Sequence, residues 1–224
     1  MRIAIIIPVH NEREKIGCIL EGIREKEIDV IVIDDGSSDG SGELAKENGA
    51  IVLRNEQKQG KGASLRRGFQ RALDMRVDGV ITMDGDGQHA VGDIDLFLTK
   101  IKSDPICVVT GNRMHNSKGM PLLRYTTNRL MSWFISSLCG QSMPDTQCGY
   151  RFVHSDILRQ LKLTSNEFEI ETEVLMQASR LGFKIFSVPI KTIYRNEKSK
   201  INPLRDTIRF FAYIFKEVRA SRKK

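Results

Sequence analysis

Two aspartates, Asp84 and Asp86, are separated by one glycine and follow an apolar segment that is typical of a buried strand. Carboxylates held this close repel each other, and a hard divalent cation such as Mg²⁺ or Mn²⁺, which shares their oxygens with phosphate and water, relieves the repulsion. The pattern therefore indicates a metal site. A solvated Asp-Gly turn is one alternative. A calcium loop that also uses Gln88 and Asp95 is another, although His89 stands where that loop requires glycine.

Two more polar loops follow apolar segments in the first part of the chain. Residues 34–40 read Asp-Asp-Gly-Ser-Ser-Asp-Gly, and residues 8–12 read Pro-Val-His-Asn-Glu. Each loop taken alone fits the cap of a following helix, with Asp, Ser or Asn as the capping residue. Three acid-bearing loops after three strands of one parallel sheet would open on the same edge, however, and open α/β sheets bind ligands there. The loops are therefore predicted to form one site, in which the second loop could hydrogen-bond a base or a ribose.

Helical and strand periods alternate along the chain. Ile16, Ile19, Leu20 and Ile23 recur at helical spacing, whereas the strand segments are continuous β-branched runs. Continuous apolar strands that alternate with helices predict an α/β fold, a single domain with a mostly parallel central sheet and helices on both faces. The expected strands span 2–9, 30–33, 50–53, 79–83, 106–110, 149–153 and 185–190, and the expected helices span 16–23, 65–73, 94–101, 122–138 and 169–181.

The composition is that of one folded globular protein. The chain has 224 residues, of which 40% are hydrophobic, and its 35 Lys and Arg against 28 Asp and Glu give a net charge of +7. This balance argues against long disorder and fibrous repeats. A charge of +7 without a zinc-finger, RNP or helix-turn-helix pattern does not predict binding to nucleic acid. Four cysteines without a Cys-x-x-Cys pair indicate reduced thiols and no zinc site.

Apolar runs in the sequence fall far short of the roughly 20 residues that span a bilayer. Polar residues follow the first run directly, which argues against a signal peptide, so a cytoplasmic protein is expected. Residues 204–224 form a basic amphipathic segment after a domain at residues 1–203, and this segment could be a core helix, an interfacial helix on anionic lipid or a nucleic-acid patch. Its apolar residues are Leu204, Ile208, Phe211, Phe215 and Val218.

Two common nucleotide-binding patterns are missing from the sequence. The segment Gly60-Lys61-Gly62-Ala63-Ser64 lacks the earlier glycine and the immediate Ser or Thr of a P-loop, and no Gly-x-Gly-x-x-Gly follows the first expected strand. Lys61 is still a candidate for a contact with phosphate, and a solvated lysine in a glycine-rich turn is the alternative.

Read in order, the blocks at 5–12, 32–40, 60–63 and 84–89 resemble the inverting family-2 glycosyltransferases. They look closest to the branch of dolichol-phosphate mannose synthases and bacterial polyprenyl-phosphate glycosyltransferases. Residues 145–151, Asp-Thr-Gln-Cys-Gly-Tyr-Arg, are similar to an Asp-Thr-x-x-Gly-aromatic-Arg element of that branch. The resemblance implies a single GT-A-type domain that binds a nucleotide-diphosphate sugar at the strand ends, together with Mg²⁺ or Mn²⁺.

The resemblance also implies roles for individual residues. Asp84, Asp86 and Gln88 would hold the metal against the diphosphate, and Asp86 is counted with Arg113 and Asp145 among the catalytic residues. Arg113 matches an arginine near the phosphates, and Lys200 resembles a lysine on a loop that closes over them. His10 stands where synthases of the eukaryotic type carry Tyr, which leaves the base open. The nucleoside pocket would comprise Pro8, His10, Glu12, Ile33 and Asp35, with Glu12 and Asp35 accepting hydrogen bonds from the base or ribose.

The expected reaction transfers a hexose, with inversion, from a donor of the GDP-mannose or UDP-glucose type. A polyprenyl or dolichyl phosphate acceptor is ionised near neutral pH and requires no protein base. A soluble or glycan hydroxyl acceptor would require one, and Asp145 is the candidate, with bracing of the Pro144 turn as its alternative role. A lipid acceptor further implies a peripheral position on the inner face of the membrane, with a membrane-protein partner or a homo-oligomer as expected assemblies. A non-catalytic nucleotide-sugar-binding partner is the alternative from another class.

Overall fold

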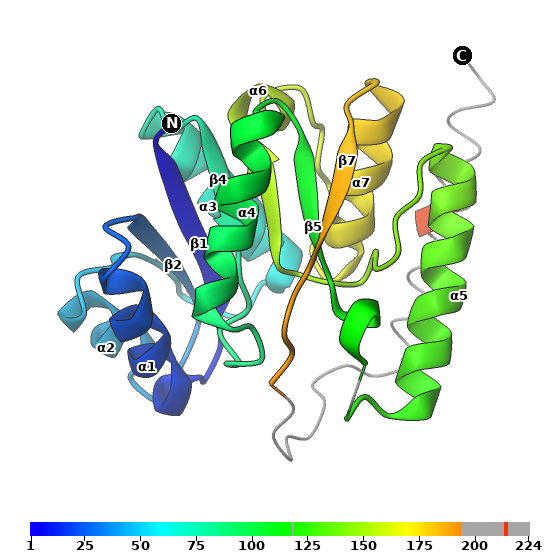
Figure 1. Cartoon of the computed structure of the whole chain (residues 1–224). Coiled ribbons are helices and arrows are strands. Elements are labelled where there is room, and N and C mark those ends of the chain that lie inside the picture. The colour runs from blue at the N-terminus through cyan, green and yellow to red at the C-terminus, as the bar shows by residue number, and fades with distance from the viewer. Residues whose placement is uncertain (118, 194–212, 215–224) are drawn as a thin grey trace.

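A mixed sheet runs through the centre of the molecule (Figure 1). The computed structural model describes residues 1–117, 119–193 and 213–214. Within these residues, seven strands lie in the spatial order β3-β2-β1-β4-β6-β5-β7. The strands are β1 (Ile3–Val9), β2 (Asp29–Asp35), β3 (Ile51–Asn55), β4 (Gly79–Thr82), β5 (Val108–Asn112), β6 (Arg151–His154) and β7 (Ile185–Pro189).

One strand, β6, runs against the others. It pairs antiparallel with β4 and β5, whereas β1, β2, β3 and β4 pair parallel with their neighbours and β5 pairs parallel with β7. The carboxyl ends of six strands and the amino end of β6 therefore share one edge of the sheet, at the bottom of Figure 1. The predicted α/β fold with a mostly parallel sheet is confirmed.

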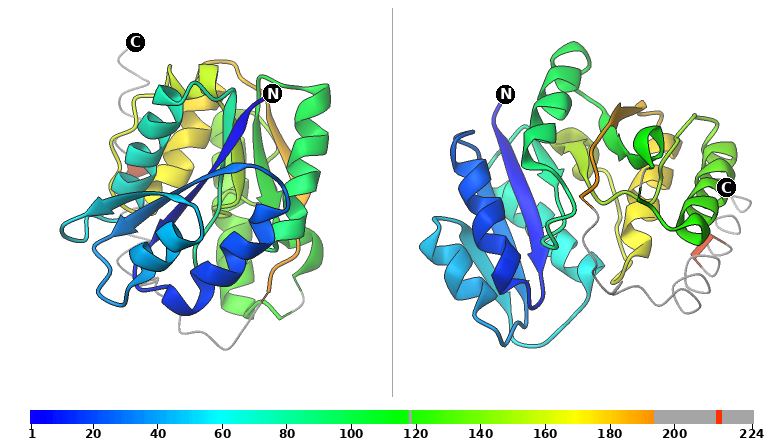
Figure 2. Two further views of the ribbon diagram at one scale, coloured as in Figure 1. Left: turned by 90° about the vertical axis from the view of Figure 1, so that its left-hand side faces the viewer. Right: turned by 60° about the horizontal axis from the view of Figure 1, so that its bottom comes forward.

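Helices cover both faces of this sheet (Figure 1 and Figure 2, left). α1, α2 and α4 lie on one face and α3, α6 and α7 on the other, and α5 packs beside α7. Short helical turns, η1 (Val91–Asp93) and η2 (Arg113–Asn116), precede α4 and α5. The helices are α1 (Arg13–Arg24), α2 (Ser41–Glu47), α3 (Lys61–Asp74), α4 (Ile94–Ser103), α5 (Leu122–Cys139), α6 (Ser155–Leu158) and α7 (Glu169–Arg180).

The continuous apolar run of β1 is explained by burial on both sides. Ile5 and Ile7 belong to the core beneath α1 and α4, and Ala4 and Ile6 belong to the core beneath α3. A strand buried on both faces has no polar side, so its residues read as an unbroken apolar segment. Gly68 brings α3 close to the sheet, because a β-carbon there would lie 2.6 Å from Ile6 Cγ2.

The sequence pattern does not predict two of the helices. α2 contains Leu44 and Ala45 as its only apolar residues, which are too few for a recognisable stripe, and α6 has four residues. The strand expected at 149–153 begins at Arg151 instead, and the residues before it form a loop at the carboxyl edge. In the described part of the chain, no helix combines the length and the apolar character needed to cross a bilayer.

Candidate active site at the carboxyl edge of the sheet

Polar segments from several strands meet at the carboxyl edge, which the right-hand view of Figure 2 brings forward. The loops after β1, β2, β4 and β5 all begin there, as parallel pairing requires. Arg151 at the start of β6 pairs with Thr82 at the end of β4 and with Thr110 in β5. The reversed direction of β6 therefore brings residues 145–150 to the same edge.

The acidic loop after β4 lies tightly against the end of β1. A β-carbon on Gly85 would lie 2.8 Å from Val9 Cγ1, so only glycine allows this approach. Asp86 Oδ1 accepts a hydrogen bond from the backbone N–H of Gln88 at 3.0 Å, which closes the turn. Asp84, Asp86 and Gln88 are all half-buried and come from one short loop.

Lys61, at the start of α3, joins this loop to α7. Its Nζ lies 2.5 Å from Asp84 Oδ1 and 2.6 Å from Glu171 Oε1. Gly149, from the loop before β6, packs against all three groups, because a β-carbon there would lie 2.8 Å from Asp84 Oδ2, 2.8 Å from Lys61 Nζ and 2.9 Å from Glu171 Oε1. Residues far apart in the sequence thus form one charged cluster.

The two aspartates of the loop differ in their electrostatics. Burial alone would raise the pKa of Asp84, but the charge and hydrogen bond of Lys61, together with smaller contributions that include the charge of Arg113, outweigh it, and the pKa falls to about 2. Burial and the Asp84 charge raise the pKa of Asp86 to about 6. Burial opposes the charge on Lys61, yet Asp84 and Glu171 together raise its pKa. The negative charge of Asp84 and Asp86 is therefore only partly balanced by Lys61. A bound cation would balance the rest.

The oxygen ligands of the acidic loop suit Mg²⁺ or Mn²⁺ that is also coordinated by phosphate and water. No three His, Cys, Asp or Glu side chains form a metal cage among the described residues. Asp84, Asp86 and the Gln88 amide supply hard oxygen atoms, which Mg²⁺ binds through one or two carboxylates and completes with phosphate and water. The calcium-loop alternative does not fit, because Asp95 lies on α4 and its carboxylate binds Lys26 Nζ at 2.8 Å.

His89 contacts both the acidic loop and the loop before β6. Its Nδ1 accepts a hydrogen bond from the backbone N–H of Asp84 at 3.2 Å, and its ring stacks on Tyr150 with the centroids 4.9 Å apart. Burial lowers the pKa of His89 to about 4, so the ring is neutral near pH 7. The acidic loop and the loop before β6 are thereby held against each other.

The expected nucleoside-pocket residues form a network between the first two loops. His10 Nδ1 donates to the backbone carbonyl of Asp35 at 2.9 Å. The Asp35 carboxylate is buried and accepts three hydrogen bonds, from Asn55 Nδ2 and from the backbone N–H groups of Gln59 and Gly60. These bonds fasten the loop that carries Lys61, a role beyond the ribose contact expected from sequence.

The other three residues of the expected pocket differ in exposure. Glu12 is buried beside the start of α1, with Oε2 3.3 Å from Lys15 Nζ, and its backbone N–H donates to Ser41 Oγ. Pro8 is half-buried at the end of β1. The Ile33 side chain is fully buried in the core beneath α3, so it supports the edge from within the sheet.

Arg113 and Asp145 form a buried bidentate pair. Arg113 Nε and Nη2 donate to Asp145 Oδ2 and Oδ1 at 2.7 and 2.9 Å, and the backbone N–H of Arg113 adds a third bond. Burial opposes ionisation of Asp145, but Arg113 outweighs it and holds the pKa below its ordinary value. Asp145 is therefore an ionised anchor for Arg113, a contact that is distinct from the bracing of the Pro144 turn expected as its alternative role.

Arg151 shapes the loop that carries Asp145. Its Nε donates to the carbonyl of Cys148 at 2.6 Å, its Nη2 donates to that of Thr146 at 2.6 Å, and its Nη1 donates to that of Glu171. One buried guanidinium thus ties the loop before β6 to the first turn of α7. The expected Lys200 and the basic segment 204–224 lie outside the described residues, except for the buried pair Tyr213 and Ile214.

Glu171 is the member of the cluster that sequence reasoning missed. It is buried on α7 and binds Lys61, yet it stands in an acidic stretch that is typical of a solvated helix face. One sequence signal could have identified it. Glu171, Thr172 and Glu173 occupy positions at which the apolar stripe of the helix should continue, so polar residues there indicate buried polar contacts. All three of these residues are buried.

Gly149→Ala tests whether the charged cluster is needed. The added methyl group displaces the flexible ends of Lys61, Asp84 and Glu171, so we expect the donor turnover that the family resemblance implies to fall by about tenfold or more while the melting temperature changes little. Gly92→Ala is the matched control, because nothing lies within 4 Å of a β-carbon at Gly92. Equal turnover in both variants, measured as release of nucleoside diphosphate, would contradict a role for the cluster.

Comparison with known families gives one match over most of the chain. Residues 4–162 match the model described as Glycosyl transferase family 2. The chain is 31% identical over 215 residues to the UDP-N-acetylglucosamine–dolichyl-phosphate N-acetylglucosaminyltransferase of Methanococcus voltae, covering 86% of each chain. It is 29% identical over 213 residues to the undecaprenyl-phosphate mannosyltransferase of Micrococcus luteus, covering 87% of this chain and 85% of the relative.

Solved structures share the fold at lower identity. Mannosyl-3-phosphoglycerate synthase from Rubrobacter xylanophilus superposes with a TM-score of 0.73 at 18% identity, over 100% of this chain and 74% of the other. Glucosyl-3-phosphoglycerate synthase from Mycobacterium tuberculosis, solved with Mn²⁺ and UDP-glucose, gives a TM-score of 0.70 at 23% identity, over 88% of this chain and 72% of the other.

Proposed function

This chain belongs to glycosyl transferase family 2, and we propose that it transfers one hexose, with inversion, from a nucleotide-diphosphate sugar to a polyprenyl phosphate. The observation that carries the proposal is the cluster at the carboxyl edge, where a carboxylate pair, Lys61 and Arg113 gather in one place. The relatives named for dolichyl phosphate and undecaprenyl phosphate, which match most of the chain, support the lipid acceptor.

The donor is assigned to the carboxyl edge. Asp84, Asp86 and Gln88 would hold Mg²⁺ or Mn²⁺, which when bound supplies positive charge to the departing diphosphate. Lys61 and Arg113 are the protein cations for the same charge, because both lie close enough to Asp84 to lower its pKa. The loops with Pro8, His10, Glu12 and Asp35 are assigned to the nucleoside, and donors of the GDP-mannose and UDP-glucose types are the candidates.

In this proposal Lys61 and Arg113 stabilise the departing diphosphate by their positive charge, and Glu171 and Asp145 hold these two side chains in position. Asp145 holds the Arg113 guanidinium by two bonds, and Glu171 holds Lys61, so neither cation has to reorganise when negative charge develops. A phosphate acceptor is already ionised near neutral pH, so no side chain has to remove a proton. Asp145 is therefore proposed as a positioning residue.

A screen of donors tests the proposal. GDP-mannose, UDP-glucose and related donors are incubated with the full chain and Mg²⁺ or Mn²⁺, with and without a polyprenyl phosphate, and release of nucleoside diphosphate is measured. We expect release that requires both the metal and the lipid phosphate. Release with metal alone would overturn the lipid acceptor and point to water or a soluble hydroxyl, and nucleotide binding without any turnover would favour the non-catalytic alternative.

A further inference from the structure

The outer face of α5 exposes four large apolar side chains, with the small polar residues Thr126 and Ser137 between them. Leu122 and Leu123 are each 76% exposed, Leu130 is 64% exposed and Trp133 is 66% exposed. At 3.6 residues per turn, these four side chains fall within an arc of about 100°. The opposite side of the helix is buried and carries Asn128, Ser132 and Ile135. Several large apolar groups on one helix face mark an interaction surface, whereas single exposed ones do not.

The charged residues of α5 are all basic. The helix has two arginines, Arg124 and Arg129, and no acidic residue. Arg129 is exposed and lies on the exposed side with the leucines, and its Nη1 donates to Tyr125 Oη at 3.0 Å. An apolar face that includes a tryptophan and has Arg129 beside it complements an anionic bilayer, where the aromatic ring lies at headgroup level and the guanidinium meets lipid phosphate.

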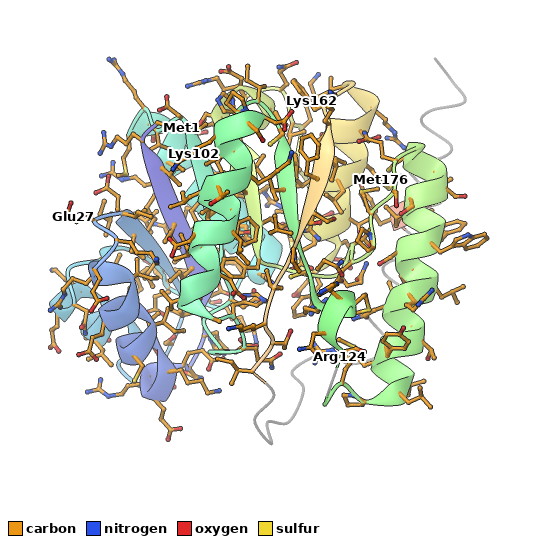
Figure 3. All side chains as sticks on the ribbon, in the orientation of Figure 1. Met1, Glu27, Lys102, Arg124, Lys162 and Met176 are labelled. Carbon is orange, nitrogen blue, oxygen red and sulfur yellow. The ribbon has the colours of Figure 1, made fainter. Side chains whose placement is uncertain are left out.

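The inner face of α5 is attached directly to the candidate active site. Ser132 Oγ accepts a hydrogen bond from the backbone N–H of Thr146 at 2.9 Å and lies 3.2 Å from Thr146 Oγ1. Thr146 follows Asp145, the anchor of Arg113. The first turn of α5, where Arg124 is labelled in Figure 3, lies at the bottom of the molecule with the carboxyl edge. One helix thus presents leucines outward and holds the site with its other side.

We propose that the outer face of α5 lies on an anionic lipid bilayer and sets the carboxyl edge beside the headgroups. The inference rests on the proposed function, since a polyprenyl phosphate keeps its chain in the membrane and its phosphate at the surface. A second copy of the chain fits this face less well. A symmetric contact would bring the Arg129 side chains of two identical helices together with no acid on either helix to pair them.

The only tryptophan of the chain, Trp133, reports on this face. The full chain is mixed, without donor, with vesicles of phosphatidylcholine and phosphatidylglycerol in equal parts, and tryptophan emission and co-sedimentation are recorded. We expect a blue shift of Trp133 emission and binding that weakens with salt or in pure phosphatidylcholine. Leu122→Ser with Leu123→Ser should weaken vesicle binding by about tenfold or more. Ile106→Ser is the matched control, because Ile106 is exposed at the opposite edge, before β5 begins.

Three outcomes would overturn this inference. The chain could stay in the supernatant. It could sediment with unchanged Trp133 emission and equal binding by the leucine variant, which would place the contact on another segment. The emission could shift with protein concentration in the absence of vesicles, which would indicate a second copy. A separate assay of nucleoside diphosphate release with a short, water-soluble prenyl phosphate tests the proposed function without a bilayer, so failure of one is distinguished from failure of the other.

Discussion

Asp84→Asn is expected to lower donor turnover by at least about 100-fold while the chain stays folded. The substitution removes the carboxylate that Lys61 binds and that is assigned to the metal, and the described residues form no group of three or more His, Cys, Asp or Glu side chains that could hold a metal in its place. Stability should change little, because Lys61 keeps Glu171 as a partner at 2.6 Å. Release of nucleoside diphosphate gives the first readout, and Mn²⁺ binding in the presence of nucleoside diphosphate gives the second.

Asp95→Asn is the matched control for this substitution. Asp95 is an exposed carboxylate on α4 that pairs with Lys26, outside the charged cluster. Turnover and Mn²⁺ binding should both be unchanged in this variant. If Asp84→Asn kept full turnover and bound Mn²⁺ as tightly as the Asp95 control, the metal assignment would be wrong.

Asp145→Ala is expected to lower the free energy of unfolding by about 3–5 kcal/mol, because it leaves a buried guanidinium without its partner. Arg113 is 5% exposed and Asp145 is fully buried. For a chain of this size, the loss corresponds to a fall in melting temperature of roughly 6–20 °C. Thermal unfolding measures it. A proton acceptor with no bracing role would instead lose turnover at unchanged stability, which would contradict the assignment of Asp145 as the anchor of Arg113.

A double variant separates the two roles of the pair. Arg113→Met with Asp145→Leu replaces both charges by apolar groups of similar size, and such replacements are often neutral or stabilising. We expect most of the stability to return while donor turnover stays low, because the guanidinium assigned to the donor phosphates is gone. Full turnover in the double variant would remove Arg113 from the site.

The sheet was predictable from sequence because its strands are buried on both faces. β1, residues 30–33 of β2 and residues 79–81 of β4 are continuous apolar runs, because both faces of these strands are buried, and their helices carry clear apolar stripes. The position of β6 was not predictable, since apolar spacing does not report strand direction or order. α2 and α6 were missed because helices this short carry too few apolar residues to show a period.

The candidate site was predictable as far as it depends on loops that follow parallel strands. Asp84, Asp86 and the loops after β1 and β2 were expected to share an edge, and their strands pair in parallel. The pairing of Arg113 with Asp145 was not foreseeable, because it depends on where β6 enters the sheet. Glu171 was missed for a similar reason, as its position on α7 matters only once α3 brings Lys61 beside it. It also lies beyond residues 4–162, the segment that the family model matches.

The placement of β6 between β4 and β5 also constrains the order in which the chain can fold. β5 comes before β6 in the sequence. Among the described strands, however, β5 is connected to β4 only through β6, which pairs with both. The first four strands in chain order can pair without β6, and β5 can pair with β7, but these two groups of strands join only when β6 docks between them. Because non-local pairing of this kind is slow, we expect the amides of β1 and β2 to gain protection before those of β5 in pulsed hydrogen exchange. The ion pair of Arg113 with Asp145 would then form among the last contacts of the molecule.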